Sequence, residues 1–187
     1  MHWRRINLVL NFGQGSELAL NDILHNIQYG EWPSVFARLN YCVDNGFLLH
    51  GSHLSSIDVL RAGLRPICST DNPALAMMYA IRPDETFVPL SEREIWAVEN
   101  QPSQGPKIWA TKHFLKKAGP GTIYVVEPDQ FRQGKIIVEY VAFSPVRPVA
   151  RIDVKPSDLP CKVGRLSKKM ADYYRAVLVQ QSEIFPW

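Results

Sequence analysis

A run of apolar residues, Phe47-Leu48-Leu49, ends abruptly in the polar sequence His50-Gly51-Ser52. Apolar residues that stop at a small polar corner are typical of a buried strand that opens onto a cleft. This stretch therefore predicts a strand that carries His50 to the cleft mouth, with the rest of the chain organised around it. Because Gly51 has no Cβ, we expect a ligand to lie directly against its backbone.

The segment after this strand has the pattern of a short helix. Its apolar residues recur at helical spacing: Ile57, Leu60 and Leu64. Ser55 or Ser56 is available as the N-cap, and Gly63 as the left-handed residue that ends the helix. The predicted order is strand, sharp turn, short helix, and then an exit through Gly63-Leu64-Arg65-Pro66.

A second strand and a second helix are predicted directly downstream. Ile67–Thr70 is expected to be a short strand that ends in two small hydroxyl residues, Ser69 and Thr70. The sequence Asp71-Asn72-Pro73 then starts a helix over 73–81, because either of its first two residues can act as cap and proline suits the first helical position.

Glu139 stands out in the second half of the chain. It falls in the middle of a long predicted strand, Lys135–Phe143, among apolar neighbours. An acidic residue is costly to bury there without a partner or a purpose. Glu139 is therefore either a functional carboxylate or a solvent-facing charge on an edge strand.

The remaining chain predicts further regular elements. Strands are expected at 122–127 and 146–154. Ser91-x-x-Glu94 fits a capping box at a helix start, and the segment 95–98 fits a strand equally well. Helices are expected at 18–27, from 34 to 43, at 108–117 and at 166–178.

Two parts of the sequence resemble the diphtheria-toxin/poly(ADP-ribose) polymerase group of ADP-ribosyltransferases. His50-Gly51-Ser52, followed by Gly63-Leu64-Arg65, resembles the motif that opens the NAD-binding core of these enzymes. Glu139-Tyr140-Val141-Ala142-Phe143 resembles the strand that carries their catalytic glutamate. The resemblance covers residues 47–154 and places three candidate catalytic residues in the family's order: His50, Tyr79 and Glu139.

The family resemblance implies a fold. It implies an α+β architecture, an ADP-ribosyltransferase-like split β-sandwich of mostly antiparallel strands with peripheral helices and the cleft between two packed sheets. Residues 1–187 would form a single domain. Within it, 1–46 would be an N-terminal helical segment, 47–154 the NAD-binding core, and 155–187 a C-terminal helical tail.

The resemblance also implies a chemistry, the transfer of ADP-ribose from NAD⁺ to a macromolecular acceptor with release of nicotinamide. Glu139 would bind the 2′-hydroxyl of the nicotinamide ribose and stabilise the developing cation. His50 would donate to a hydroxyl of the adenosine ribose, and Tyr79 would stack on the nicotinamide ring. Ile137 stands where arginine-directed members of the superfamily carry a second glutamate, which speaks against arginine as the acceptor.

NAD⁺ is the implied co-substrate, and no metal is required. The backbone of Gly51 would bind the nicotinamide carboxamide, assisted by Ser52. The residues expected to contact NAD⁺ are His50, Gly51, Ser52, Ser69, Thr70 and Tyr79.

Length, charge and composition limit the number of domains and the classes of partner that the chain can have. With 187 residues and a net charge of +3, the chain suits one domain with a full core and does not demand a nucleic-acid partner. No apolar run approaches the roughly 20 residues of a membrane span. Cys42, Cys68 and Cys161 are isolated and fit reduced, partly buried thiols, and the histidines lack metal-ligand spacing. We expect a cytoplasmic monomer, and by analogy of fold and size a toxin or effector.

Two other functions fit the same residues. An NAD⁺-consuming RNA 2′-phosphotransferase shares the His-Gly turn but needs basic residues in an N-terminal helical part, where residues 11–46 contain only Arg38 as a strong base. A non-catalytic module would bind NAD⁺, ADP-ribose or a nucleic acid through the same cleft. A basic rim for nucleic acid would consist of Lys112, Lys116, Lys117, Arg165, Lys168 and Lys169.

Overall fold

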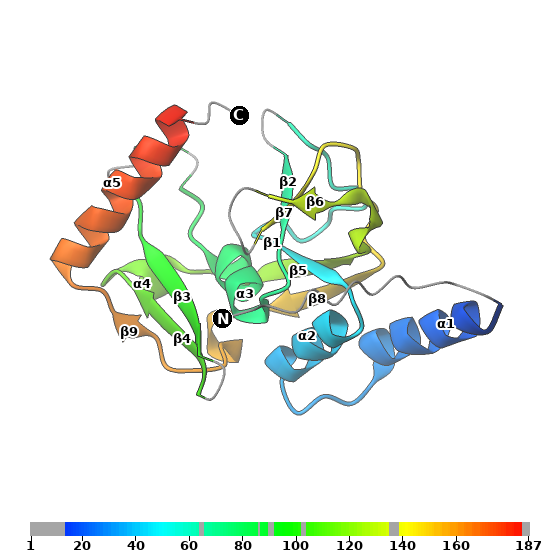
Figure 1. Cartoon of the computed structure of the whole chain (residues 1–187). Coiled ribbons are helices and arrows are strands. Elements are labelled where there is room, and N and C mark those ends of the chain that lie inside the picture. The colour runs from blue at the N-terminus through cyan, green and yellow to red at the C-terminus, as the bar shows by residue number, and fades with distance from the viewer. Residues whose placement is uncertain are drawn as a thin grey trace, which may run out of the picture.

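The computed structural model describes residues 14–63, 66–85, 87–89, 92–101, 104–134 and 139–184. The fold is a mixed α+β arrangement of small sheets around a central helix (Figure 1). The helices are α1 Gln14–Tyr29, α2 Val35–Asp44, α3 Pro73–Ile81, α4 Phe114–Lys117 and α5 Lys168–Ile184. Short 3₁₀ turns occupy Pro128–Gln130 and Pro156–Asp158.

The described strands form three three-stranded sheets rather than the two packed sheets that were expected. The first sheet has the order β1-β5-β8, the second β2-β7-β6 and the third β3-β4-β9. All pairings are antiparallel except that of β4 with β9. The strands are β1 Leu48–Ser52, β2 Ile67–Ser69, β3 Trp96–Gln101, β4 Gly105–Ala110, β5 Gly121–Val126, β6 Arg132–Gln133, β7 Tyr140–Ala142, β8 Ala150–Val154 and β9 Gly164–Arg165.

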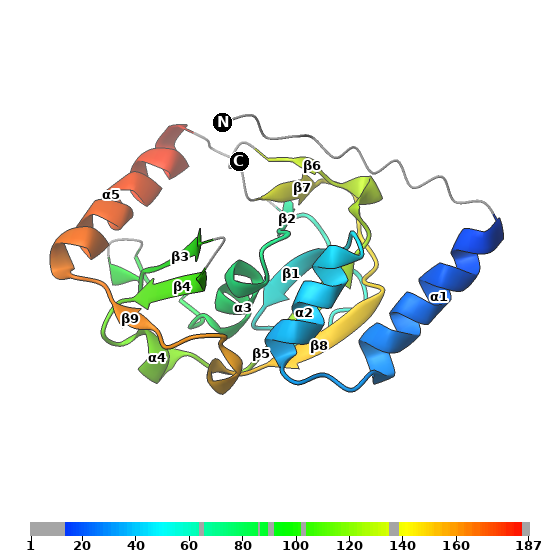
Figure 2. The ribbon, with the colours of Figure 1, turned by 60° about the horizontal axis from the view of Figure 1, so that its bottom comes forward.

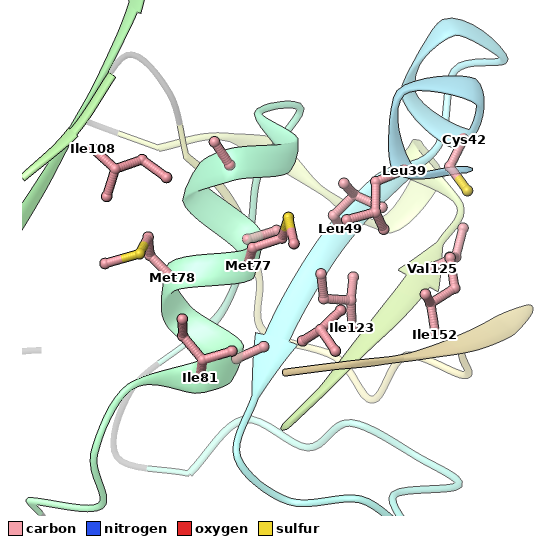
Figure 3. Packing of buried hydrophobic residues seen from close by; sticks show 14 of the residues in the cluster. Leu39, Cys42, Leu49, Met77, Met78, Ile81, Ile108, Ile123, Val125 and Ile152 are labelled. Atoms are coloured by element: carbon pink, nitrogen blue, oxygen red, sulfur yellow. The ribbon is translucent and has the colours of Figure 1, made fainter. Parts of the chain in front are cut away.

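Helix α3 lies between the first and third sheets and forms the centre of the core (Figure 1). Met77 and Met78 are fully buried, as is Ile81 at its C-terminal end. Figure 3 shows Met78 pointing toward Ile108 of β4, while Met77 points toward Leu49 of β1. The helix is therefore apolar on all sides, as expected for one enclosed between sheets.

The start of α3 follows from its sequence. The side chain of Asn72 accepts a hydrogen bond of 3.1 Å from the Leu75 N–H, and Pro73 occupies the first helical turn. The prediction of a helix over 73–81 is thus confirmed, with Asn72 rather than Asp71 as the cap.

The N-terminal helices pack on the same core. Ser34 caps α2 by accepting from the Ala37 N–H at 3.1 Å, and the helix ends at Asn45, followed by Gly46 with a positive φ of 85°. Helix α2 packs against β1 and α3, and α1 packs against β8 (Figure 2). Arg38 Nε joins the two helices by donating to the Ile27 carbonyl at 2.6 Å.

The predicted helix over 55–64 does not form in its described part, 55–63. That segment consists of bends and one isolated bridge, and Gly63 has no positive φ. Its apolar residues are used by distant partners instead: Leu60 exchanges two backbone hydrogen bonds with Val146, of 2.8 and 3.0 Å. The hydroxyl of Tyr124 accepts from the Ile57 N–H and donates to the Leu54 carbonyl. These long-range contacts outweigh the helical spacing.

Other expected bounds also change. The predicted helix over 108–117 is wrong for its first part, because Gly105–Ala110 pairs with β3 and only Phe114–Lys117 is helical. Within the predicted strand Lys135–Phe143, residues 135–138 lie outside the described residues and β7 covers only Tyr140–Ala142. Glu139 therefore directly precedes a short strand. The last predicted strand is shorter, Ala150–Val154, and the tail helix α5 is longer.

The cysteines differ in exposure. Cys42 is buried in the core, where burial raises the pKa of its thiol to about 12, and Cys161 is half-buried. Cys68 is exposed, which corrects the expectation of three partly buried thiols. None of the described helices combines the length and the apolar character that crossing a membrane takes.

Candidate active site

His50 sits in β1 at the point where β1 and β2 diverge. Its Nδ1 lies 2.7 Å from the carbonyl oxygen of Cys68 in β2. Since a carbonyl only accepts, Nδ1 carries the proton and Nε2 of the neutral ring is an acceptor. Burial lowers the pKa of His50, and the charge of Arg82 lowers it further against the opposing hydrogen bond. The neutral ring is therefore favoured, and it would accept from a ribose hydroxyl rather than donate as expected.

Tyr79 lies in the last turn of α3 and is half-buried. Its hydroxyl donates a hydrogen bond of 2.8 Å to Oε1 of Glu139. Burial, and then the neighbouring Glu139 carboxylate, raise the pKa of Tyr79 well above its ordinary value of 10.0. The phenol therefore keeps its proton at neutral pH and remains a donor to Glu139.

The strand arrangement explains why these residues meet. β1 and β2 are joined by one bridge, in which Leu49 and Thr70 exchange two backbone hydrogen bonds of 2.9 Å. β2 pairs in turn with β7, and one further step of their register sets Thr70 opposite Glu139. His50 and Glu139 thus flank β2 from its two sides, although they lie far apart in the sequence.

Gly51 has a different steric role from the one expected. A Cβ built on Gly51 would lie 2.2 Å from the Ala76 carbonyl oxygen and 2.9 Å from Cβ of Tyr79. The missing side chain therefore makes room for α3 rather than for a ligand. A Cβ built on Gly121, on the neighbouring strand, would likewise lie 2.0 Å from the Ala80 carbonyl oxygen. Helix α3 is seated directly on the backbone of β1 and β5.

The backbone of Gly51 still faces a usable edge. Backbone polar groups in an antiparallel strand alternate between its two sides, so those of Gly51 point the same way as those of Leu49. The backbone amide and carbonyl of Leu49 bond to Thr70, and β1 is an edge strand of its sheet. The amide and carbonyl of Gly51 therefore face the junction that also holds His50.

The three expected hydroxyl contacts are placed less favourably. The Oγ of Ser52 accepts from the Leu54 N–H at 3.1 Å. Ser69 and Thr70 are each only 3% exposed, and the Thr70 hydroxyl accepts from the Asn72 N–H at 3.1 Å. Ser69 Oγ is buried without a hydrogen-bond partner. Ser69 and Thr70 therefore lie beneath the surface of the junction.

Two residues that the sequence did not single out contact Tyr79. The Trp96 ring meets it edge-on at 4.9 Å between centroids, and the Arg82 guanidinium lies 5.6 Å from its centroid. Arg82 follows Tyr79 by three residues, a spacing that brings side chains to one helix face and gave a usable signal. Trp96 comes from another sheet, and nothing local in the sequence points to it.

Two largely buried carboxylates between Arg82 and Trp96, those of Glu85 and Glu94, share the exposed cation of Lys117. Lys117 Nζ lies 3.0 Å from Oε1 of Glu94 and 3.6 Å from Oε1 of Glu85. The Glu94 N–H donates to Glu85 Oε2 at 2.9 Å, and the Thr111 hydroxyl donates to the Glu94 carboxylate. Burial alone would raise the pKa of Glu94, but these hydrogen bonds outweigh burial and lower it.

The other candidate features are distributed as follows. Leu64 and Arg65 of the first motif lie outside the described residues. All members of the proposed basic rim are exposed, and Lys117 among them is also engaged in ion pairs. Within the described ranges, no group of three or more His, Cys, Asp or Glu side chains is arranged to hold a metal ion.

Two hollows of the described surface lie away from these residues. One hollow lies between residues 129–132 and 141–144, and another between 33–36 and 157–160. Neither is lined by His50, Tyr79 or Glu139. A ligand that stacks on the side of the Tyr79 ring where Arg82 lies would displace its guanidinium.

Comparison with known proteins adds no relative: neither protein-family models, nor curated proteins, nor solved structures gave a match to this chain. The functional assignment depends on the residues themselves.

Proposed function

We propose that this protein is an NAD-dependent ADP-ribosyltransferase that moves ADP-ribose from NAD⁺ to a macromolecular acceptor and releases nicotinamide. The observation that carries the proposal is the 2.8 Å hydrogen bond from Tyr79 to Glu139. Two residues selected for this chemistry, 60 positions apart, are direct partners. His50 lies in β1 and Glu139 directly precedes β7, the two strands on either side of β2.

Glu139 would act on the nicotinamide ribose. When the bond from C1′ to the nicotinamide nitrogen breaks, nicotinamide leaves neutral and positive charge develops on the ribose. A carboxylate hydrogen-bonded to the 2′-hydroxyl stabilises that charge. An acceptor hydroxyl, thiol or amine then bonds to C1′, and its proton passes to Glu139 and on to solvent. Tyr79 would hold the carboxylate in place through Oε1.

His50 would position the dinucleotide. With Nδ1 bonded to the Cys68 carbonyl, Nε2 accepts a hydrogen bond from a ribose hydroxyl. The amide and carbonyl of Gly51 would pair with the nicotinamide carboxamide along the edge of β1. The mostly antiparallel sheets β1-β5-β8 and β2-β7-β6 would be the two halves of an ADP-ribosyltransferase-like split sandwich. We further propose that the enzyme acts as a cytoplasmic monomer.

The test is nicotinamide release from NAD⁺ by the purified protein and by Glu139→Gln. We expect the variant to lose about a hundredfold or more in rate, since it keeps the shape of the side chain but not its charge. Glu127→Gln removes an exposed carboxylate beyond the end of β5 and is the matched control. Mass spectrometry of cellular protein and nucleic acid after expression identifies the acceptor by an added ADP-ribose.

Two results would replace this proposal. Binding of NAD⁺ without release of nicotinamide, even with cell extract as acceptor, would leave a non-catalytic binding module. Release of a 2′-phosphate from RNA would indicate the phosphotransferase reaction. Arg38 argues against the phosphotransferase reaction. It is the strong base of residues 11–46, and its Nε donates to the Ile27 carbonyl between α1 and α2 rather than facing a phosphate.

A further inference from the structure

Arg82 is a cation at the candidate site that forms no ion pair with an acidic side chain of the described residues. It caps the C-terminal end of α3 and is exposed, with its guanidinium over the Tyr79 ring. In the described part of the chain no carboxylate forms an ion pair with it. By contrast, Arg38 and Arg175 donate to backbone carbonyls. An exposed, unpaired guanidinium is available to a ligand.

Arg82 and Glu139 place a positive and a negative charge on either end of the Tyr79 side chain. The Tyr79 hydroxyl contacts the Glu139 carboxylate, while the ring of the same residue lies under the Arg82 guanidinium. Negative and positive groups are thus separated by one tyrosine side chain. A ligand that spans both would carry positive charge at one end and negative charge at the other, a short distance apart.

We infer that Arg82 binds the diphosphate of the nicotinamide dinucleotide and thereby selects phosphate-bearing nicotinamide ribosides as substrates. The assignment of the substrate rests on the proposed function. A guanidinium presents paired N–H donors that match two phosphate oxygens. In NAD⁺ the nicotinamide ribose bears its phosphate on the 5′-oxygen, so C1′ beside Glu139 and the phosphate beside Arg82 belong to one sugar.

Binding of Arg82 to the diphosphate would also let nicotinamide reach the Tyr79 ring. The Arg82 guanidinium lies over one side of the Tyr79 ring, 5.6 Å from its centroid. Phosphate would draw the guanidinium off the ring, and the vacated face would then receive the nicotinamide. Arg82 therefore couples recognition of the charged part of the dinucleotide to opening of the stacking position.

Binding measurements by calorimetry separate these roles. They compare wild type, Arg82→Gln and Arg82→Lys, with NAD⁺, ADP and nicotinamide riboside as ligands. Arg151→Gln is the matched control, because Arg151 is equally exposed but lies on β8, the far strand of the first sheet. We expect Arg82→Gln to weaken NAD⁺ and ADP roughly ten- to hundredfold, the range for a lost charge-assisted hydrogen bond. Nicotinamide riboside, which carries no phosphate to draw the guanidinium off the ring, should bind to Arg82→Gln at least as tightly as to wild type.

The outcomes are distinct. Arg82→Lys should retain part of the affinity for NAD⁺, and the salt dependence of NAD⁺ binding should decrease in Arg82→Gln. Equal weakening of NAD⁺ and nicotinamide riboside would mean that Arg82 only positions Tyr79, and no change with any ligand would equally overturn the inference. A wild type that binds ADP through Arg82 but never releases nicotinamide would refute the proposed reaction and keep the phosphate contact. A wild type that binds neither NAD⁺ nor ADP would end both.

Discussion

The hydroxyl of Tyr79 donates a hydrogen bond to Oε1 of Glu139, with 2.8 Å between the two oxygens. The tyrosine comes from the central helix and the glutamate from the residue before β7, so the bond fixes the helix relative to the second sheet. It also gives Tyr79 a role beyond the stacking that the family resemblance implies. The phenol holds a carboxylate oxygen in place through a donor that keeps its proton at neutral pH.

This bond predicts the behaviour of Tyr79→Phe. The variant keeps the aromatic ring and loses the donor, so Glu139 should be less well oriented toward the ribose. We expect the rate of nicotinamide release to fall roughly ten- to hundredfold, since a hydrogen bond to a charged group contributes about 1.5–3 kcal/mol. The KM for NAD⁺ should change little, which steady-state kinetics would measure.

Tyr140→Phe is the control for that experiment. The Tyr140 hydroxyl donates to Asp71 Oδ2 at 3.1 Å, so the change removes the same kind of bond one residue away from Glu139. Its rate should stay near that of wild type. If Tyr79→Phe also releases nicotinamide at the wild-type rate, the hydroxyl does not serve catalysis.

Gly51→Ala should destabilise the fold. The new methyl carbon would lie 2.2 Å from the Ala76 carbonyl oxygen, so α3 has to move away from β1. Overpacking of this kind typically costs about 1–3 kcal/mol. Urea unfolding followed by circular dichroism measures the loss. Gly63→Ala is the matched control, because nothing lies within 4 Å of its Cβ, and its stability should change by less than about 0.5 kcal/mol.

His50 should titrate below its ordinary pKa of 6.5, because burial and the charge of Arg82 disfavour the imidazolium. The unfolded chain then binds the proton more readily, so the stability that His50 contributes is lost as pH falls below about 6.5 toward the lowered pKa. Proton NMR of the imidazole measures this pKa directly.

The same titration tests the coupling to Arg82. Removing the positive charge in Arg82→Gln should raise the pKa of His50, whereas Arg151→Gln should leave it unchanged. A pKa at or above 6.5 in wild type would contradict the neutral imidazole on which the acceptor role of Nε2 depends.

Lys117→Met should destabilise the fold by removing the cation that Glu85 and Glu94 share. Glu94 and Glu85 have side chains only 8% and 11% exposed, and the change leaves both without their cation. The pKa of Glu94 is lowered in the folded chain, so its stabilising contribution is present above pH 4.5 and is lost as pH falls through the lowered value.

The unfolding midpoint of Lys117→Met should therefore differ from that of wild type at neutral pH and converge with it in acid, where the carboxylates are protonated. Lys116→Met, which removes an exposed neighbour, should unfold like wild type throughout. A loss of stability in Lys117→Met that persists unchanged in acid would show that the charge cluster is not its cause.

The sequence predicted best those elements whose ends are decided locally. Helix α2 begins at its Ser34 cap and ends before Gly46, and α3 begins at Asn72 and Pro73. The helix expected over 55–64 failed because Tyr124 and Val146, distant in the sequence, bind the backbone of that segment. No local pattern reports such partners.

The same distinction applies to the site. His50, Tyr79 and Glu139 were selected because short motifs resemble those of one enzyme family, and the hydrogen bond between the last two was not predicted. Trp96 reaches Tyr79 from a separate sheet, so its role required the fold. Gly51 was selected correctly as a position without room for a side chain, but the neighbour that fills the space is α3.

The two glycines beneath α3, Gly51 and Gly121, limit which substitutions the protein can accept during evolution. Because main chain rests on main chain at Gly51 and Gly121, the height of the helix above the strands is set by carbonyl and amide radii. Exchanges among the methionines and isoleucines around the helix would alter how firmly it is held, yet not how high it sits. Substitutions in the apolar core should therefore leave the seat of α3 on β1 and β5, and with it the height of Tyr79 above these strands, largely unchanged.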